Sequence, residues 1–315
     1  MKQRINTGII LFLIILTAFL LRSVEYIFFD TFIALAVVVA TAEVSRVFIR
    51  SGKDNFMELG VIYAIVVYLT LMWGINSSFD FSSYLLSQSI ILAFFFALSF
   101  TISYVTKRQL PQATNKRKLS DYEYSIRKSL TTLFIMVYPA LILSFLYLVN
   151  NMSSLRLSSV ATTAFAGVDI GLLVLIMIFF TTISTDTLAY FGGKTIGGKK
   201  LAPLISPKKT ISGAIVGIIG GVLSSLLTFA IFYSISIYNV AFFQAEITIW
   251  HFLAYGVLAS IISQIGDLFA SAVKRKARAK DFSTLFPGHG GVMDRLDGVS
   301  FNTVFTFLFV LVFFL

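Results

Sequence analysis

Long apolar segments recur from one end of this 315-residue chain to the other, and they constrain its fold more than any other feature. Hydrophobic residues make up 57% of the chain and charged residues 13%, about half the charged fraction of a soluble domain. Helices satisfy their backbone hydrogen bonds internally in a bilayer, whereas a membrane barrel would show short segments of alternating polarity. We therefore predict an all-α polytopic integral membrane protein.

About nine transmembrane helices follow if each span takes roughly 20 apolar residues. Residues 1–21 are similar to a secretory signal, but no convincing small-residue cleavage site precedes Arg22, so we expect a retained first helix. The predicted spans lie near residues 5–22, 26–45, 58–75, 84–106, 130–149, 168–190, 212–237, 250–274 and 299–315.

The distribution of basic residues predicts the orientation of these helices. If the loops alternate between two sides, the side of the N-terminus receives 23 of the 25 lysine and arginine residues, and only Arg22 and Arg156 fall opposite. The positive-inside rule then makes the N-terminus and the basic loops cytoplasmic. The net charge of +10 is thereby explained by topology, and we expect no nucleic-acid partner. Chain length and the lack of long tails fit a bacterial inner-membrane protein.

Two regions are predicted: N-terminal membrane helices with a basic cytoplasmic loop over 1–129, and a C-terminal catalytic membrane region over 130–315. In the basic stretch 116–130, Ser120 and Glu123 have the spacing of a helix capping box. This stretch either binds anionic lipid headgroups or serves only as a topology signal, and both readings stay open. Cysteine is absent, which excludes disulfides and thiolate chemistry.

Two acidic residues lie inside predicted spans, where a charge is costly. An aspartate at the centre of a membrane helix costs roughly 2.5–3.5 kcal/mol on insertion scales. Asp186 and Asp267 carry this cost and are therefore candidates for a functional site. Asp30 and Asp169 lie near predicted helix starts, where an acid is stabilised by the helix dipole.

Polar side chains share one face of the predicted helix 250–274. Spacings of 3, 4 and 3 residues place Gln264, Asp267, Ser271 and Lys274 on that face, and Arg275 follows directly. One acid near the middle and two bases at the cytoplasmic end suit a site for a metal ion and phosphate. An internal ion pair or polar contacts between helices would give the same pattern.

The stretch "FPGHGGVMDRLDG" at 286–298 strengthens the functional reading, because a plain connecting loop needs none of these residues. Asp294 and Asp297 offer the hard oxygen ligands that Mg²⁺ prefers, and the glycines allow close backbone approach. Arg295 either pairs with these acids or holds a phosphate. We expect His289 to order the glycine turn or bond a phosphate, with an acid–base role as the weaker alternative.

A second basic loop, "YFGGKTIGGKKLAPLISPKKT" at 190–210, has the composition of a phosphate-binding loop. Ser206, Lys208 and Lys209 are its candidate ligands. The signal is weak by itself, since the loop neither follows a strand nor matches the Walker A pattern.

These motifs together resemble the CDP-diacylglycerol synthase family, also called phosphatidate cytidylyltransferases. The resemblance is firm over about residues 184–298 and includes "SPKKT" at 206–210 and the D-x-x-A-Y motif of Asp186 to Tyr190. One departure is Ser212, where the family commonly has a glutamate. The matching positions of the family signature are Ser271, Lys274, Arg275, Lys280, Asp281, Ser283, Phe286, Pro287, His289, Gly290, Gly291, Asp294, Arg295 and Asp297.

The resemblance implies that phosphatidate attacks the α-phosphorus of CTP at the cytoplasmic leaflet, giving CDP-diacylglycerol and pyrophosphate. It also implies a need for Mg²⁺, a second cation such as K⁺, membrane lipids as partners and a homodimer. We expect Asp267 and Asp294 to converge on the metal, with Asp297 as a third ligand or a supporting partner. Substrate and nucleotide contacts are expected from Ser206, Lys208, Lys209, Ser271, Lys274, Arg275, Asp186, His289 and Arg295.

Three other functions stay open. Another CTP-using membrane enzyme, such as a lipid-alcohol kinase, would release CDP instead of pyrophosphate. A transporter would place its polar groups near the bilayer midplane between internal repeats, whereas here they gather at one side and no repeat is visible. A catalytically inactive relative is the third, because the departure at Ser212 removes a glutamate that could matter to catalysis.

Overall fold

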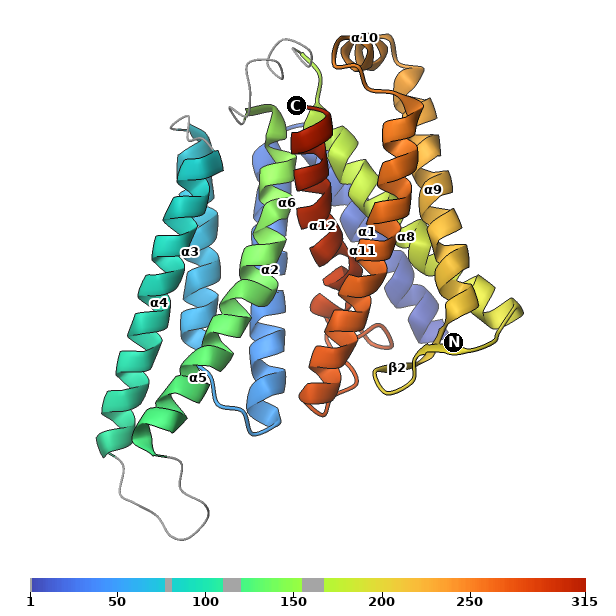
Figure 1. Ribbon diagram of the computed structural model, residues 1–315. Coiled ribbons are helices and arrows are strands. Elements are labelled where there is room, and N and C mark those ends of the chain that lie inside the picture. Colours follow the sequence, from blue (N-terminus) through green and yellow to red (C-terminus); the bar gives the residue numbers. More distant parts are fainter. Residues whose placement is uncertain (1, 77–80, 110–119, 155–166) are drawn as a thin grey trace.

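The computed structural model describes residues 2–76, 81–109, 120–154 and 167–315 and shows a bundle of long helices that run roughly side by side (Figure 1). The helices of the bundle are α1 (Lys2–Arg22), α2 (Tyr26–Arg50), α3 (Met57–Asn76), α4 (Phe81–Gln109), α5 (Asp121–Ile135), α6 (Ile142–Asn150), α8 (Ile170–Thr195), α9 (Ile211–Tyr233), α11 (Ile249–Lys276) and α12 (Met293–Phe313). The short elements are η1 (Met136–Leu141), η2 (Met152–Ser154), α10 (Ser236–Gln244) and the strands β1 (Lys200–Ala202) and β2 (Ser206–Thr210).

Eight helical segments in the described part of the chain are long and apolar enough to cross a membrane. One of them, Asp121–Asn150, joins α5, η1 and α6 through the segment that contains Pro139. The shorter apolar segment Thr7–Arg22 of α1 accounts for the first predicted span. The predicted class, an all-α polytopic membrane protein with about nine helices, is therefore confirmed, and the structure adds a small β1–β2 hairpin.

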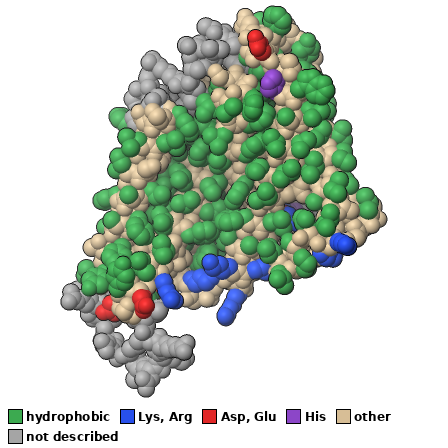
Figure 2. Space-filling model, viewed as in Figure 1, with side chains coloured by type: hydrophobic (Ala, Val, Ile, Leu, Met, Phe, Trp, Pro, Cys, Tyr) green, Lys and Arg blue, Asp and Glu red, His purple; other side chains and the backbone are tan. Residues whose placement is uncertain are grey.

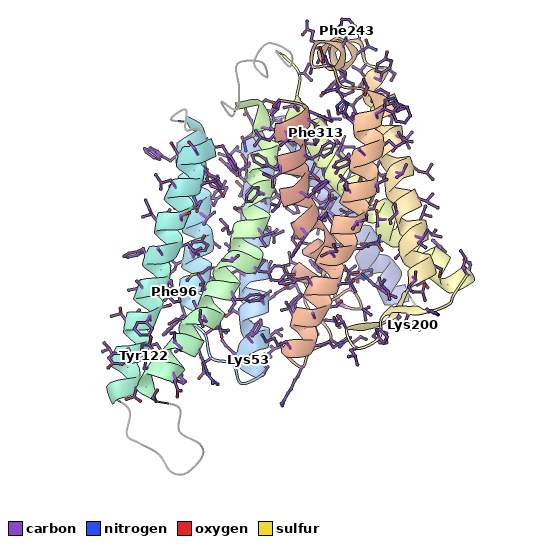
Figure 3. The ribbon with its side chains drawn as sticks, viewed as in Figure 1. Lys53, Phe96, Tyr122, Lys200, Phe243 and Phe313 are labelled. Atoms are coloured by element: carbon purple, nitrogen blue, oxygen red, sulfur yellow. The ribbon has the colours of Figure 1, made fainter. Side chains whose placement is uncertain are left out.

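Basic side chains gather along one end of the bundle, below a broad apolar surface (Figure 2). Lys53 and Lys200 lie at this end, which we call the basic face, whereas Phe243 and Phe313 lie at the opposite end (Figure 3). This arrangement matches the predicted alternation of loops, and the cytoplasmic assignment of the basic face stays a prediction.

The basic stretch 116–130 is described only from Ser120 onward, and Arg156 also lies outside the described residues. The predicted capping box is confirmed: Glu123 N donates to Ser120 Oγ at 3.2 Å, and Ser120 N donates to the Glu123 carboxylate at 3.0 Å. Helix α5 runs across the predicted boundary between residues 129 and 130, and the division into two regions stays a prediction from sequence.

Small residues bring α8 and α9 into close contact. A Cβ at Gly213 would lie 2.6 Å from the carbonyl oxygen of Ala189, and one at Gly220 would lie 2.8 Å from that of Ser184. Since lipid tails are as apolar as leucine, membrane helices associate through such close packing rather than through hydrophobic burial. The contact holds the C-terminal half of α8 against the start of α9, which directly follows the β-hairpin.

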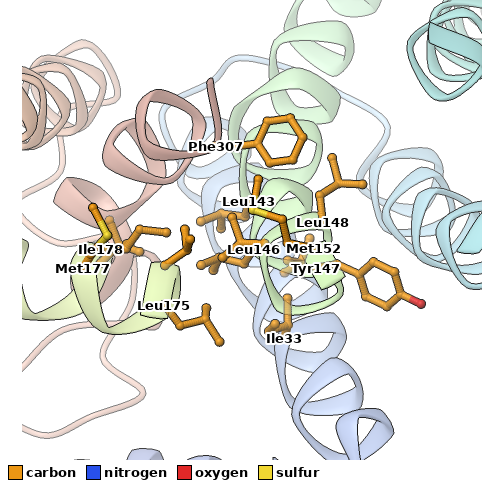
Figure 4. Packing of buried hydrophobic residues seen from close by; sticks show 14 of the residues in the cluster. Ile33, Leu143, Leu146, Tyr147, Leu148, Met152, Leu175, Met177, Ile178 and Phe307 are labelled. Atoms are coloured by element: carbon orange, nitrogen blue, oxygen red, sulfur yellow. The ribbon is translucent and has the colours of Figure 1, made fainter. Parts of the chain in front are cut away.

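A buried apolar cluster joins the N-terminal helices to the C-terminal ones (Figure 4). Leu143 and Leu146 of α6 pack among side chains of α2, α8 and α12, including Ile33, Leu175 and Phe307. The interior is close-packed here, so displacement of α2 relative to α12 would disturb the whole bundle.

The structure corrects the extent of two predicted loops. Helix α12 begins at Met293, so Asp294, Arg295 and Asp297 lie on its first turns rather than in the connection. Residues 286–290 form a tight turn, in which Phe286 N donates to Gly290 O at 2.8 Å and Gly290 has φ of 80°. Helix α12 can begin this early because Asp294 accepts a hydrogen bond from the backbone of the turn. The spacing of residues in the sequence does not reveal this contact. The predicted loop 190–210 likewise forms the end of α8 and the β-hairpin.

Candidate active site

A cavity of about 500 Å³ lies near the basic face, between α8, the β-hairpin, the start of α9, α11 and the start of α12. Eight of the twelve predicted site residues line it. Segments separated by more than 80 residues in sequence therefore converge, as the predicted site for a metal ion and phosphate requires. The eight are Asp186, Lys208, Lys209, Asp267, Lys274, Asp294, Arg295 and Asp297.

Lys274 of α11 lies between two acids of α12. Its Nζ is 2.9 Å from Asp294 Oδ1 and 3.6 Å from Asp297 Oδ2, and the lysine side chain is only 11% exposed. A buried ammonium group needs such partners, because desolvation of an unpaired charge is costly. The pairing fixes the end of α11 against the start of α12, and it places Lys274 among carboxylates rather than open to solvent.

Asp294 also holds the glycine turn. Its Oδ2 accepts hydrogen bonds from the backbone N–H groups of Phe282 at 2.8 Å and Gly291 at 2.9 Å. That oxygen is thus used by the protein itself, while Oδ1, bonded to Lys274, keeps one lone pair. Asp294 and Asp267 line the same cavity. That the two carboxylates bind one ion stays a proposal, in which Asp294 would contribute Oδ1.

Asp267 of α11 forms an ion pair with Lys209 of β2, which draws the hairpin over the cavity. Asp186 and Asp297 are close enough to Asp267 to repel it electrostatically. Three acids thus face a cavity with Lys209 and Lys274 as their nearest counter-charges. Lys208 and Arg295 line the same cavity, so acidic and basic side chains both face it.

In the part of the chain that the structure describes, no three acidic or histidine side chains form a preformed metal site. Mg²⁺ commonly takes one or two protein carboxylates together with water and substrate phosphates. The carboxylates of Asp186, Asp267 and Asp297 are hard oxygen donors that line one cavity, so they fit an ion that arrives with a nucleotide.

Four predicted residues do not line the cavity. Arg275 is tied to carbonyl groups: its Nε donates to Ile205 O at 3.3 Å and its Nη1 to Ala279 O at 3.2 Å. Ser206 begins β2, and Ser271 lies on α11 between Asp267 and Lys274. Their contacts with substrate stay predictions.

His289, the fourth of these residues, packs inside the turn. Its backbone N–H donates to Phe286 O at 2.8 Å, and its imidazole lies beside Gly8 of α1. Among the described residues its Nδ1 has no hydrogen-bond partner and is buried. The bond to Phe286 comes from the backbone, so a role of the imidazole in ordering the turn or bonding a phosphate stays a prediction.

Ser212 occupies the position where the resemblance led us to expect a glutamate. It lies in the first turn of α9, where its hydroxyl donates to Gly197 O and lies 3.1 Å from Thr210 Oγ1. Thr210 caps the same helix by accepting from Gly213 N. Ser212 therefore stabilises the segment between α8 and the hairpin through its hydrogen bond to Gly197 O.

One residue near the site was missed by the sequence reading. Glu43 of α2 is buried and accepts hydrogen bonds from Ser283 and from the backbone at the start of α12. It lies inside the predicted span 26–45, so the insertion cost that singled out Asp186 and Asp267 would have identified it as well.

The chain is similar in sequence to known cytidylyltransferases. A family model described as the cytidylyltransferase family matches residues 2–313. The phosphatidate cytidylyltransferase of Brucella abortus biovar 1 (strain 9-941) is 43% identical over 143 residues, which are 45% of this chain and 48% of that protein. Those of Rickettsia conorii (43% over 136 residues; 42% and 56%) and Rickettsia typhi (45% over 125 residues; 39% and 53%) are similar.

The chain spans about half the length of these curated relatives. The family model, in contrast, covers almost the whole sequence, from the first helix to the end of α12. On this evidence the chain belongs to the cytidylyltransferase family.

Proposed function

We propose that the protein is a phosphatidate cytidylyltransferase, which converts CTP and phosphatidate to CDP-diacylglycerol and pyrophosphate. The observation that carries this proposal is a cavity near the basic face that is lined by Lys208, Lys209 and Asp267 together with the start of α12. A cavity of about 500 Å³ has the size of a nucleotide site, and its position near the end of the bundle suits a lipid headgroup.

Repulsion between two anionic substrates is the first barrier in this reaction. Lys208, Lys209 and Arg295 line the cavity and would provide the fixed positive charge that offsets it. Preorganised cations also stabilise the charge that develops on the leaving pyrophosphate. A phosphate monoester dianion is itself the nucleophile, so the site needs no general base.

Magnesium would be held by Asp267 together with Asp297, Asp186 or Oδ1 of Asp294, and when bound it would neutralise charge on the triphosphate. Lys209, which pairs with Asp267 in this structure, would instead bind the phosphates of CTP. That exchange of partners frees the Asp267 carboxylate at the moment the nucleotide enters. A second cation such as K⁺ belongs to the same proposal.

Lys274 would maintain the spacing of Asp294 and Asp297 and bind phosphate through an N–H donor that Asp294 does not use. No covalent enzyme intermediate is needed, because positioning and electrostatics dominate phosphoryl-type transfers. The basic face would lie in the cytoplasm of a bacterial cell, with phosphatidate entering from the inner leaflet. The homodimer stays a prediction.

The test is product analysis with the full-length purified protein in lipid nanodiscs. Labelled CTP, phosphatidate and Mg²⁺ should give equal amounts of pyrophosphate and a CDP-lipid, and removal of Mg²⁺ with EDTA should stop both. Release of CDP with a new phospholipid would assign the protein as a lipid-alcohol kinase. Absence of turnover in protein that still binds CTP would indicate an inactive relative.

A further inference from the structure

We infer that Glu43 is a positioning residue that sets the start of α12, and hence the directions of Asp294 and Asp297, from a distant part of the chain. The role in turnover rests on the proposed function, whereas the structural role can be measured without it. Its carboxylate accepts from Ser283 Oγ at 2.6 Å, Val292 N at 3.1 Å and Met293 N at 2.9 Å.

The environment of Glu43 is unusual for a buried acid. The residue is only 4% exposed, and no lysine, arginine or histidine among the described residues lies within ion-pair distance of it. Its charge is compensated instead by N–H groups at the N-terminus of α12, where the helix dipole is positive. This arrangement satisfies both the acid and two backbone donors that would otherwise be orphaned.

The donors at the turn are divided between two acids. Gly291 N points to Asp294 Oδ2, whereas the next two N–H groups, of Val292 and Met293, point to Glu43. Asp294 is thus held by its own turn, and the turn is held by α2. A rotation of α12 about its axis would break both sets of hydrogen bonds together.

Shape supports the same conclusion. A Cβ at Gly291 would collide with the Glu43 carboxylate, so a side chain there would displace the acid from its hydrogen bonds. The contact joins residues about 250 positions apart in sequence. It is therefore a link between the N-terminal helices and the site, rather than a local feature of the loop.

A purely structural acid would change stability alone, whereas a positioning residue should change the rate of the chemical step. A misplacement of about 1 Å at a reacting centre can lower the rate about 100-fold. We therefore expect Glu43→Gln to lower kcat about 100-fold and to leave KM for CTP within about threefold, because Lys208 and Lys209 lie on a different element.

The experiment compares Glu43→Gln and Glu43→Asp with Glu58→Gln, a matched control at an exposed glutamate in the first turn of α3. Glu43→Asp keeps the charge at shorter reach and should recover part of the lost kcat, while the control should match wild type. Hydrogen exchange of a peptide over 286–296 should quicken in Glu43→Gln, and this readout stays informative even if the wild type makes no CDP-lipid.

Two results would overturn the inference: wild-type kcat in folded Glu43→Gln, or unchanged exchange over 286–296. If Glu43→Gln does not fold, Ser283→Ala replaces it, since it removes one donor and keeps the acid. Several-fold lower kcat with faster exchange in Ser283→Ala supports the inference, and wild-type values of both quantities refute it.

Discussion

Two clusters of buried charge lie at opposite ends of this bundle, and only one of them borders the cavity. The outer cluster, far from the basic face, consists of Arg22, Asp30, Asn150, Asn151 and Asp169. The inner cluster consists of Lys209, Asp267, Lys274, Asp294 and Asp297.

The outer cluster is satisfied by its own members. Arg22 binds Asp169 through two N–H groups at 2.6 and 2.8 Å, and its Nε donates to Asn150 Oδ1 at 2.5 Å. Asp30 accepts from the amide groups of Asn150 and Asn151 at 2.7 and 2.9 Å. This geometry is the bidentate pairing that makes a buried arginine tolerable, and it leaves little capacity for a ligand.

The inner cluster lines the cavity with charges that have other possible partners. Lys274 is shared by Asp294 and Asp297, and the Asp267–Lys209 pair links α11 to a hairpin rather than to another helix. The comparison teaches that a charged residue inside a membrane helix indicates function only when its partners leave lone pairs or N–H groups facing a cavity.

The sharpest test of this comparison is Asp267→Asn. If Asp267 holds the metal, CTP turnover should fall about 100- to 1,000-fold, the size of a lost electrostatic contact at a reacting centre. The melting temperature in detergent should change little, because the carboxylate is 23% exposed and Lys209 is its one ion-pair partner among the described residues. Turnover near wild type in Mg²⁺ would contradict the metal assignment.

The reverse pattern is expected for Asp169→Asn in the outer cluster. Removing one partner leaves the Arg22 guanidinium buried with an incomplete set of acceptors, at a cost of about 3 kcal/mol in the free energy of unfolding. Values of kcat and KM measured below the melting temperature should stay within about twofold, because distant sites act independently. A matched double variant, Arg22→Met with Asp169→Leu, should regain stability. Loss of turnover in folded Asp169→Asn would break the comparison.

Acid should remove the contribution of the outer pair in a defined direction. Burial raises the pKa of Asp169, but hydrogen bonds and charge from Arg22 outweigh it, so the pKa lies below its ordinary value of 3.8. A depressed pKa contributes stability above the unfolded-state pKa, and this stability is lost as pH falls through the folded-state pKa. The stability difference between wild type and Asp169→Asn should thus be constant from pH 7 to about 5 and shrink below about pH 4. A difference that grows on acidification would be contrary to this pairing.

The smallest effect is expected at Ser212. Ser212→Ala removes the hydrogen bond to Gly197 O, and a bond of this kind contributes about 1 kcal/mol. KM for CTP should rise about fivefold as the hairpin that carries Lys208 and Lys209 loosens, with kcat unchanged. Steady-state kinetics with CTP varied would measure it, and a large fall in kcat would give Ser212 a more direct role.

Much of this molecule could be predicted from local patterns. The apolar segments predicted the helices because a bilayer demands internally bonded backbone. The Ser120–Glu123 capping box was predictable from local spacing, because its donors and acceptors lie within one helical turn. Asp267 and Asp294 were predicted to converge because the loop that carries Asp294 directly follows the helix that carries Asp267, and both residues line the cavity.

Other features depend on contacts that no spacing reveals. The start of α12 at Met293 follows from Asp294 and Glu43 capping it, and Glu43 comes from α2. Arg275 bonds two carbonyl groups because α11 ends beside the hairpin turn, and its binding of phosphate stays a prediction. Ser206, which shares a motif with Lys208 and Lys209, does not line the cavity that those lysines line.

The sequence by itself determined the membrane class, the number of helices, the end at which the charges gather and the family motif. These features depend on composition and short-range periodicity, because apolar segments partition into the membrane and charged loops stay in water. Tertiary structure alone decided which charges are mutually satisfied and which face a cavity. That distinction is made by distances of a few ångströms between helices far apart in the chain, such as α2 and α12, because the direction of a hydrogen bond depends on how the helices pack.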